Sequence, residues 1–144
     1  MENEKCLSKI IRIMSEEDLV MNNEIFCQER QKIFLNCIKD PNFLIFIIQN
    51  CEEKVVGYII TRKNGEGETE VRDIDILNEN ERRKGYATEA ILELITYISK
   101  IKNLDGTKYS NMLTFNIFEE KSVIISILEK MGATCENYKY SIKI

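Results

Sequence analysis

Histidine is absent from this chain of 144 residues. Its absence excludes Ser-His-Asp and Cys-His nucleophile pairs, histidine-ligated metals and histidine acid/base chemistry. Any catalysis therefore has to use carboxylates, tyrosine, cysteine, lysine or the backbone. Proline occurs once and glycine six times, which rules out collagen-like, proline-rich and linker-dominated architectures.

No two cysteines have the C-x-x-C spacing, so a zinc or thioredoxin-type site has no support and no metal is expected. The five residues are Cys6, Cys27, Cys37, Cys51 and Cys135. Their number is odd and the N-terminus lacks the apolar core of a signal peptide. We therefore expect five free thiols in a reducing cytoplasm, each a small apolar filler rather than a reactive group. The longest apolar stretch, residues 43–48, is too short to cross a bilayer, so no membrane partner is expected.

Length and charge are those of one ordinary globular domain, covering residues 1–144. Apolar residues make up 44% and charged residues 31% of the chain, a usual balance for such a domain. The net charge of −4 argues against a dedicated nucleic-acid binder, which should have a basic face. The chain gives no sign of its oligomeric state, and a monomer or a homodimer is expected.

The periodicity of apolar residues predicts the order β-α-α-β-β-β-α-β-α-β. Strands are expected at residues 9–14, 43–49, 55–62, 69–77 and 112–117, and the tail, 134–144, as one bent strand or two short ones. Helices are expected from a capping box at Ser15, over residues 23–38, from Gly85 to about residue 101, and over 123–131. In the second helix, Ile25, Phe26, Ile33, Phe34, Cys37 and Ile38 are expected to share one face. Antiparallel strands followed by a βαβ unit predict a mixed α/β sheet.

The most informative segment is residues 74–90, where a strand ends, a polar loop follows and a helix opens on Gly-x-Ala. Arg82, Arg83 and Lys84 stand at the start of that helix, where cations oppose the helix dipole. An anionic ligand would offset this cost, and Gly85 and Ala87 give close access to free N–H groups. The segment is therefore either a phosphate cradle or a solvated charged loop.

The same residues resemble the acetyl-CoA motif of the GNAT superfamily of N-acetyltransferases, [Gln/Arg]-x-x-Gly-x-[Gly/Ala], which Arg82-x-x-Gly85-x-Ala87 matches. The segment 55–59 (VVGYI) is similar to the third strand of the family. The segments 85–90 (GYATEA) and 128–133 (LEKMGA) are similar to those of the branch that contains the ribosomal-protein N-terminal acetyltransferases. Motifs cover residues 55–133, and the order of elements agrees over nearly the whole chain.

This resemblance implies a fold with a six- to seven-stranded, mostly antiparallel sheet, about four helices and splayed central strands that hold the pantetheine arm of acetyl-CoA. It assigns to the co-substrate the main-chain groups of Ile76 and Leu77, the residues Arg82, Arg83, Lys84, Gly85, Tyr86, Ala87 and Thr88 at the pyrophosphate, and Lys121. Tyr86 is expected to serve in packing more than in chemistry. The implied reaction is direct attack of a free amine on the thioester.

Two carboxylates are candidates for the base that removes a proton from the amine. Strict alternation along the fourth strand places Val71, Asp73 and Asp75 on one face, opposite Glu70 and Arg72. Some family members carry a catalytic Glu on the face that corresponds to the first three. Asp73 and Asp75 are therefore expected to act directly or through water, or else simply to face solvent.

Several positions depart from the family pattern. A tyrosine acid is frequent where this chain has Leu128, although the ribosomal-protein branch often has Leu there. Lys121 replaces a frequent Asn, Ile124 a frequent Ser, and Ala133 the usual aromatic residue. Tyr138 and Tyr140 could reach the acceptor pocket or serve in packing.

Three functions compete on these observations. The first is an acetyl-CoA-dependent N-acetyltransferase for a primary amine, either a protein N-terminus or a small molecule. The acidic residues Glu66, Glu68, Glu70, Asp73 and Asp75 would attract such an amine, or form a solvated hairpin. The second is a CoA-binding regulatory module that has lost catalysis, and the third is an interaction domain without a cofactor.

Overall fold

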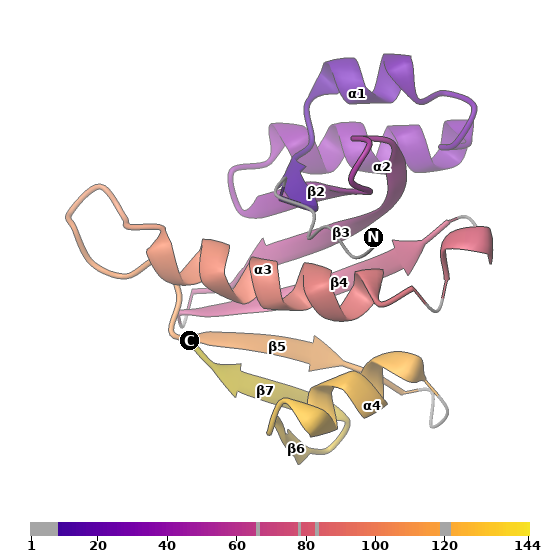
Figure 1. Cartoon of the computed structure of the whole chain (residues 1–144). Coiled ribbons are helices and arrows are strands. Elements are labelled where there is room, and N and C mark those ends of the chain that lie inside the picture. The colour runs from indigo at the N-terminus through magenta and orange to yellow at the C-terminus, as the bar shows by residue number, and fades with distance from the viewer. Residues whose placement is uncertain (1–8, 66, 78, 83, 119–121) are drawn as a thin grey trace.

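The computed structural model describes residues 9–65, 67–77, 79–82, 84–118 and 122–144. Over these ranges a twisted sheet carries helices on both faces (Figure 1). The elements are β1 (Ile11–Ile13), α1 (Glu16–Met21), α2 (Gln28–Lys39), β2 (Phe43–Gln49), β3 (Val55–Lys63), β4 (Glu68–Ile76), the 3₁₀ turn η1 (Glu79–Glu81), α3 (Tyr86–Lys100), β5 (Met112–Asn116), α4 (Val123–Lys130), β6 (Thr134–Glu136) and β7 (Lys139–Lys143). The predicted order is confirmed, and the tail forms two short strands.

The sheet has seven strands in the order β1-β2-β3-β4-β5-β7-β6. Strands β4 and β5 run parallel, whereas all the other neighbouring pairs are antiparallel. The parallel pair arises because helix α3 carries the chain back across the sheet between them, as a crossover connection requires. The predicted mixed, mostly antiparallel sheet with four helices is therefore confirmed.

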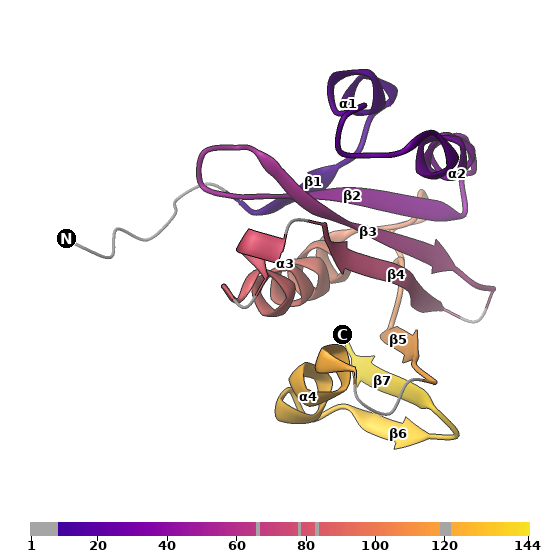
Figure 2. The same cartoon turned by 90° about the vertical axis from the view of Figure 1, so that its right-hand side faces the viewer.

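Two apolar layers hold the helices against the sheet (Figure 2). Helices α1 and α2 cover one face, where Phe26, Phe34 and Tyr58 belong to one buried cluster. Helices α3 and α4 cover the other face, where Leu94 and Leu128 belong to a second buried cluster. None of the described helices combines the length and the apolar character needed to span a membrane.

The predicted helix over residues 23–38 begins five residues late. Asn22 accepts backbone hydrogen bonds from Ile25 and Phe26 and donates through its side chain to the carbonyl of Asp18, which closes a turn after α1. Helix α2 therefore starts at Gln28, with a different phase relative to Ile25. Phe26, Phe34 and Cys37 are buried as predicted, but Ile25 and Ile33 are 42% and 54% exposed, so their predicted place on the buried face is wrong.

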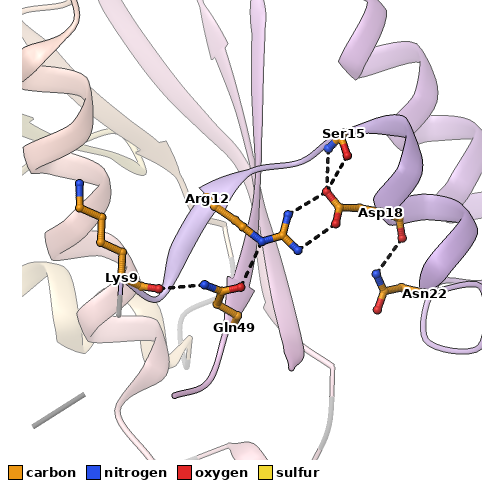
Figure 3. Close-up of polar contacts among 6 residues, drawn as sticks. All are labelled: Lys9, Arg12, Ser15, Asp18, Asn22 and Gln49. Carbon is orange, nitrogen blue, oxygen red and sulfur yellow. Dashed lines mark hydrogen bonds and ion pairs between the residues drawn. The ribbon is translucent and has the colours of Figure 1, made fainter. Parts of the chain in front are cut away.

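The junction of β1 and α1 is held by charged hydrogen bonds (Figure 3). Arg12 donates through both terminal nitrogens to the carboxylate of Asp18, at 2.9 and 2.8 Å. Asp18 also accepts from the backbone N–H of Ser15 at 2.8 Å, which completes the predicted capping box. Arg12 Nε donates to Gln49 of β2 at 3.1 Å, so α1 is tied to the sheet through one guanidinium.

The two edges of the sheet are short. Strand β1 and strand β6 contain three residues each. The N–H groups of Ile10 and Ile11 donate to the carboxylate of Glu93 on α3, at 3.0 and 3.2 Å. The side chain of a helix thus occupies backbone donors at the start of the edge strand β1.

The prediction of five free thiols is wrong at Cys51, which is disulfide-bonded. Cys27, Cys37 and Cys135 are free, and Cys6 lies outside the described residues. The sequence argument failed because an odd number of cysteines fixes only that one thiol lacks a partner within the chain. It does not prevent the remaining thiols from pairing.

Candidate active site

The parallel strands β4 and β5 are paired at one end and separated at the other. Their register runs from Glu68 opposite Met112 to Val71 opposite Phe115. Among the described residues, strand β4 then continues to Ile76 with a partner on its β3 side only. Figures 1 and 2 show the strands diverging from this point. The predicted splayed central strands are therefore present.

Side-chain contacts close the narrow end of this gap. Asn116, the last residue of β5, donates to the carboxylate of Glu70 on β4 at 2.6 Å. Lys139 of β7 lies 3.1 Å from the carboxylate of Glu68. The contact of Asn116 with Glu70 lies near the end of the backbone pairing of β4 with β5, where the gap opens, whereas Lys139 contacts Glu68 at the start of that pairing.

Backbone groups of β4 line the open side of the gap. The N–H of Leu77 donates to the carbonyl of Val56 at 2.8 Å, which directs Leu77 towards β3. Successive residues of a strand direct their main-chain groups to opposite edges. The groups of Ile74 and Ile76 therefore face the gap, and the carbonyl of Ile76 accepts a hydrogen bond from Arg82 Nε at 2.9 Å.

The start of α3 lies beside this open edge. Gly85, the N-cap residue, has φ of +83°, a conformation that residues with a Cβ adopt at a cost of about 1–2 kcal/mol. No side chain in the described part of the chain caps the first turn, whose residues include Tyr86, Ala87 and Thr88. Their N–H groups and the helix dipole favour an anion at this position.

The three predicted cations are only partly visible at this helix start. Arg82 bonds to the end of β4, and Lys84 forms an ion pair with Glu81 at 3.2 Å. Both residues are exposed. Arg83 lies outside the described residues, and so does Lys121, the other basic residue predicted to contact the co-substrate. Tyr86 is partly buried and packs against the apolar cluster beneath α3, as predicted.

A β-bulge overturns the predicted alternation along β4. Thr61 of β3 pairs with Val71 of β4, whereas the preceding residue, Ile60, pairs with Asp73. Arg72 is thus an extra residue, and a bulge of this kind changes which face the following side chains occupy. Val71 lies in the cluster beneath α3, while the residues that pair with Asp73 and Asp75, Ile60 and Tyr58, lie in the cluster beneath α2. The prediction that Val71 shares a face with the two aspartates is wrong.

The bulge places both aspartates in a polar cluster with residues that sequence analysis did not assign to the site. The hydroxyl of Tyr58 donates to Asp73 Oδ2 at 2.5 Å and accepts from Arg30 of α2 at 2.8 Å. Arg30 also lies 3.7 Å from the carboxylate of Asp75. The pKa of Tyr58 is raised, first by burial and then by its hydrogen bond to Asp73, so the phenol stays protonated over the physiological range.

Sequence signals for Arg30 and Tyr58 were weak. Tyr58 offers one hydroxyl in the apolar run of β3, where an aromatic residue is ordinary. Arg30 is one of several charged residues on α2. Only the pairing of β3 with β4 and the position of α2 bring these two side chains to the aspartates.

The other residues weighed from the sequence fall away from this cluster. Leu128 is fully buried in the core of α4, so its side chain serves in packing. Tyr140 pairs with Phe115 and packs against the same core. Tyr138 is 55% exposed, has φ of +68° and lies against the ring of Phe118, with 5.4 Å between ring centroids.

An opened parallel strand pair beside an uncapped helix start is suited to an extended ligand with an anionic group. In agreement with that class of site, the model of the acetyltransferase (GNAT) family matches residues 9–109. The match covers more than half of the chain, so the protein belongs to the acetyltransferase (GNAT) family. The predictions of this family and of an acyltransferase are therefore confirmed.

Solved structures share the fold over nearly the whole chain. Spermidine N-acetyltransferase from Vibrio cholerae, in complex with CoA and spermine, has a TM-score of 0.70 at 14% identity, covering 92% of this chain and 94% of its own. Ribosomal-protein-S18-alanine N-acetyltransferase from Escherichia coli has a TM-score of 0.67 at 17% identity, covering 93% and 92%. The aminoglycoside acetyltransferase AAC(6')-Ib, in complex with coenzyme A and kanamycin, has a TM-score of 0.70 at 14% identity, covering 92% of this chain and 93% of its own. No curated protein matches the chain.

Proposed function

We propose that this protein is an acetyl-CoA-dependent N-acetyltransferase that transfers an acetyl group to a primary amine. The observation that carries the proposal is the gap between β4 and β5 beside the uncapped start of α3. An extended chain of amides with a diphosphate at one end fits the two parts of this site together. Three solved relatives described as N-acetyltransferases or as an aminoglycoside acetyltransferase support the assignment to amines.

The residues present fit acetyl-CoA. The main-chain groups of Ile76 would pair with the pantetheine arm, whereas Leu77, the other residue expected to do so, directs its N–H to Val56 of β3. The helix start would hold the pyrophosphate through the residues that resemble the family motif: Arg82, Arg83, Lys84, Gly85, Tyr86, Ala87 and Thr88, with Lys121 as a further contact. When bound, the co-substrate supplies an activated acetyl group as a thioester.

The amine would approach on the face covered by α1 and α2. Asp73 and Asp75 lie on that face, past the last residue of β4 that pairs with β5. Their negative charge attracts a cationic amine, and either carboxylate could take up the proton that the amine loses, directly or through water.

A second candidate function is a CoA-binding module without catalysis. The observation that favours it is the residue at position 128. Leu128 is buried and carries no hydroxyl that could protonate a leaving thiolate. Binding of acetyl-CoA without turnover of any amine would select this alternative.

Calorimetric titration with acetyl-CoA tests the binding site. We expect micromolar affinity and a melting temperature that rises with ligand concentration. Gly85→Glu should abolish binding, because it places a carboxylate and a strained residue at the pyrophosphate position. Gly106→Glu is the matched control, since Gly106 has φ of +87° and equally open surroundings but lies in the loop after α3. If Gly85→Glu bound acetyl-CoA as tightly as Gly106→Glu, the assigned site would be wrong.

Release of free CoA thiol tests the reaction. The acceptor panel would contain spermidine, kanamycin and a peptide with N-terminal alanine. Asp73→Asn and Asp75→Asn are expected to differ in rate, because the two carboxylates have different partners. Near-normal, equal rates for both variants would remove these aspartates as bases.

A further inference from the structure

Tyr58 stands at the centre of the cluster that contains both aspartates. Its side chain projects from β3 and is 3% exposed. The rings of Phe34 and Phe26 lie against it, with centroids at 4.9 and 6.4 Å. The ring is thus fixed by packing, and its hydroxyl is held at one place beneath α2.

The hydroxyl has a defined hydrogen-bond direction. Arg30 Nη1 donates to Tyr58 Oη at 2.8 Å, and an arginine cannot accept in return. The single proton of Tyr58 therefore goes to Asp73 Oδ2, at 2.5 Å. Arg30 also lies over the Tyr58 ring, 5.2 Å from its centroid, which fixes the guanidinium to the same residue.

The two aspartates differ in how they are held. Asp73 accepts a hydrogen bond from a buried phenol through one oxygen, yet the residue is exposed, so its carboxylate can be reached by a substrate. Asp75 lies 3.7 Å from Arg30, and both side chains are 36% exposed. Asp75 therefore has a looser ionic contact with the same guanidinium that orders Tyr58.

We propose that Tyr58 and Arg30 are positioning residues, and that they make Asp73, not Asp75, the carboxylate that takes the proton of the amine. This inference rests on the proposed function. An exposed aspartate samples several rotamers, whereas a bond from a rigid donor selects one, which pre-organises its second oxygen. Asp75 is neutralised in part by Arg30 and has no such rigid donor, so it is the weaker candidate for the base.

The step balances as follows. The amine nitrogen forms a bond to the carbonyl carbon of the thioester, and the bond between that carbon and sulfur breaks. Asp73 takes the proton that the nitrogen loses, and the sulfur leaves with the electron pair as a thiolate. Tyr58 keeps its proton throughout, because burial and the bond to Asp73 hold it in the phenol form.

A double-mutant cycle tests the proposal, with acetylation of the fastest member of the acceptor panel as the readout. Tyr58→Phe removes one oxygen and keeps the ring, and we expect kcat to fall on the order of tenfold. Asp73→Asn should lower kcat on the order of a hundredfold. The KM for the amine and the Kd for acetyl-CoA should stay within about twofold in Tyr58→Phe, because the phenol is buried beneath α2.

The combination of the two changes is decisive. If Tyr58 acts through Asp73, the double variant Tyr58→Phe/Asp73→Asn should be no slower than Asp73→Asn alone. Tyr97→Phe is the matched control: its ring also packs edge-on against a phenylalanine, Phe46, but on the face beneath α3. This control should keep the wild-type kcat. Arg30→Lys should retain more activity than Arg30→Met, because it keeps a cationic donor.

A normal kcat for Tyr58→Phe, or multiplicative losses in the double variant, would overturn this inference while leaving the proposed function intact. Absence of turnover in the wild-type chain would instead overturn both proposals. The contact itself has a readout that needs no substrate, the ¹³C signal of the Tyr58 ring carbon bonded to oxygen. This signal should move in Asp73→Asn at neutral pH, because the phenol then loses the carboxylate to which it donates. An unchanged signal would show that the bond does not form.

Discussion

Single residues determine how closely β4 approaches β3 at the site. A Cβ on Gly57 would collide with the carbonyl oxygen of Asp75, on the strand that bears the candidate base. This close approach, rather than freedom of φ, explains glycine at this position. The spacing that sets Asp75 beside Arg30 therefore depends on a residue that contributes no side chain.

Replacing Gly57 should disturb both stability and the site. We expect Gly57→Ala to lower the free energy of unfolding by about 2 kcal/mol, because overpacking forces the strands apart. Urea denaturation measures the loss. Gly65→Ala serves as the control, since a Cβ at Gly65 would meet nothing within 4 Å. Equal stability of the two variants would contradict the steric argument.

A second residue carries a buried group without a hydrogen bond. The hydroxyl of Thr69, in the part of β4 that pairs with β5, has no partner among the described residues. Thr69→Val removes this group at nearly constant volume. We expect the free energy of unfolding to rise by about 1 kcal/mol, and the melting temperature by about 3 °C. A lower melting temperature would mean that a partner satisfies the hydroxyl in solution.

At the scale of elements, the charged junction of β1 and α1 predicts a dependence of stability on pH. Burial raises the pKa of Asp18, but hydrogen bonds from Arg12 and Ser15 lower it by more, so it lies below the ordinary 3.8. A carboxyl whose pKa is lowered by folding stabilises the fold at pH values above its pKa in the unfolded chain. This contribution is lost as the pH falls through the pKa of the folded state.

Asp18→Asn should therefore lose stability mainly at neutral pH. We expect a deficit of about 2 kcal/mol at pH 7, which narrows below about pH 4 as the wild-type carboxyl is protonated. Urea unfolding at pH 7, 5 and 3 measures both proteins. A deficit that stays constant across this range would indicate a packing effect and not an ionic one.

The open edge of β4 makes a prediction for individual amides. Bound acetyl-CoA should slow hydrogen exchange at Ile76, whose N–H faces the gap, and have little effect at Leu77, whose N–H already bonds to Val56. Amide exchange followed by NMR measures both positions. Equal protection at the two amides would contradict the assigned edge.

The same elements show what the sequence could predict. The periodicity of apolar residues predicted the order of elements, and the motif from Arg82 to Ala87 predicted the family. Both signals are local along the chain. The bulge at Arg72 was not predictable, since it is a mismatch in register between two strands and alters no local pattern. The turn that Asn22 closes displaced α2 for a similar reason. Arg30 and Tyr58 join the site only through tertiary packing.

At the scale of the molecule, the site lies where two parts of the sheet meet. Strands β1 to β4 form an antiparallel meander, whereas β5, β7 and β6 are joined to it through four residue pairs of β4 with β5 and the side-chain contacts of Glu68 and Glu70. We expect amides of β5 and β7 to exchange faster than those of β2 and β3, because their attachment is shorter. Acetyl-CoA should reduce this difference, and mass-spectrometric exchange with and without it measures the effect. Uniform exchange across the sheet would contradict this division.

The short edges of the sheet limit how copies of this chain can associate. A long, unpaired edge strand is a template for other strands and promotes aggregation. Here β1 and β6 have three residues each, and Glu93 occupies backbone donors of Ile10 and Ile11 at one edge. Extension of the sheet from one molecule to the next is thereby disfavoured. Self-association of this protein is therefore expected to use side-chain surfaces and not continued strand pairing.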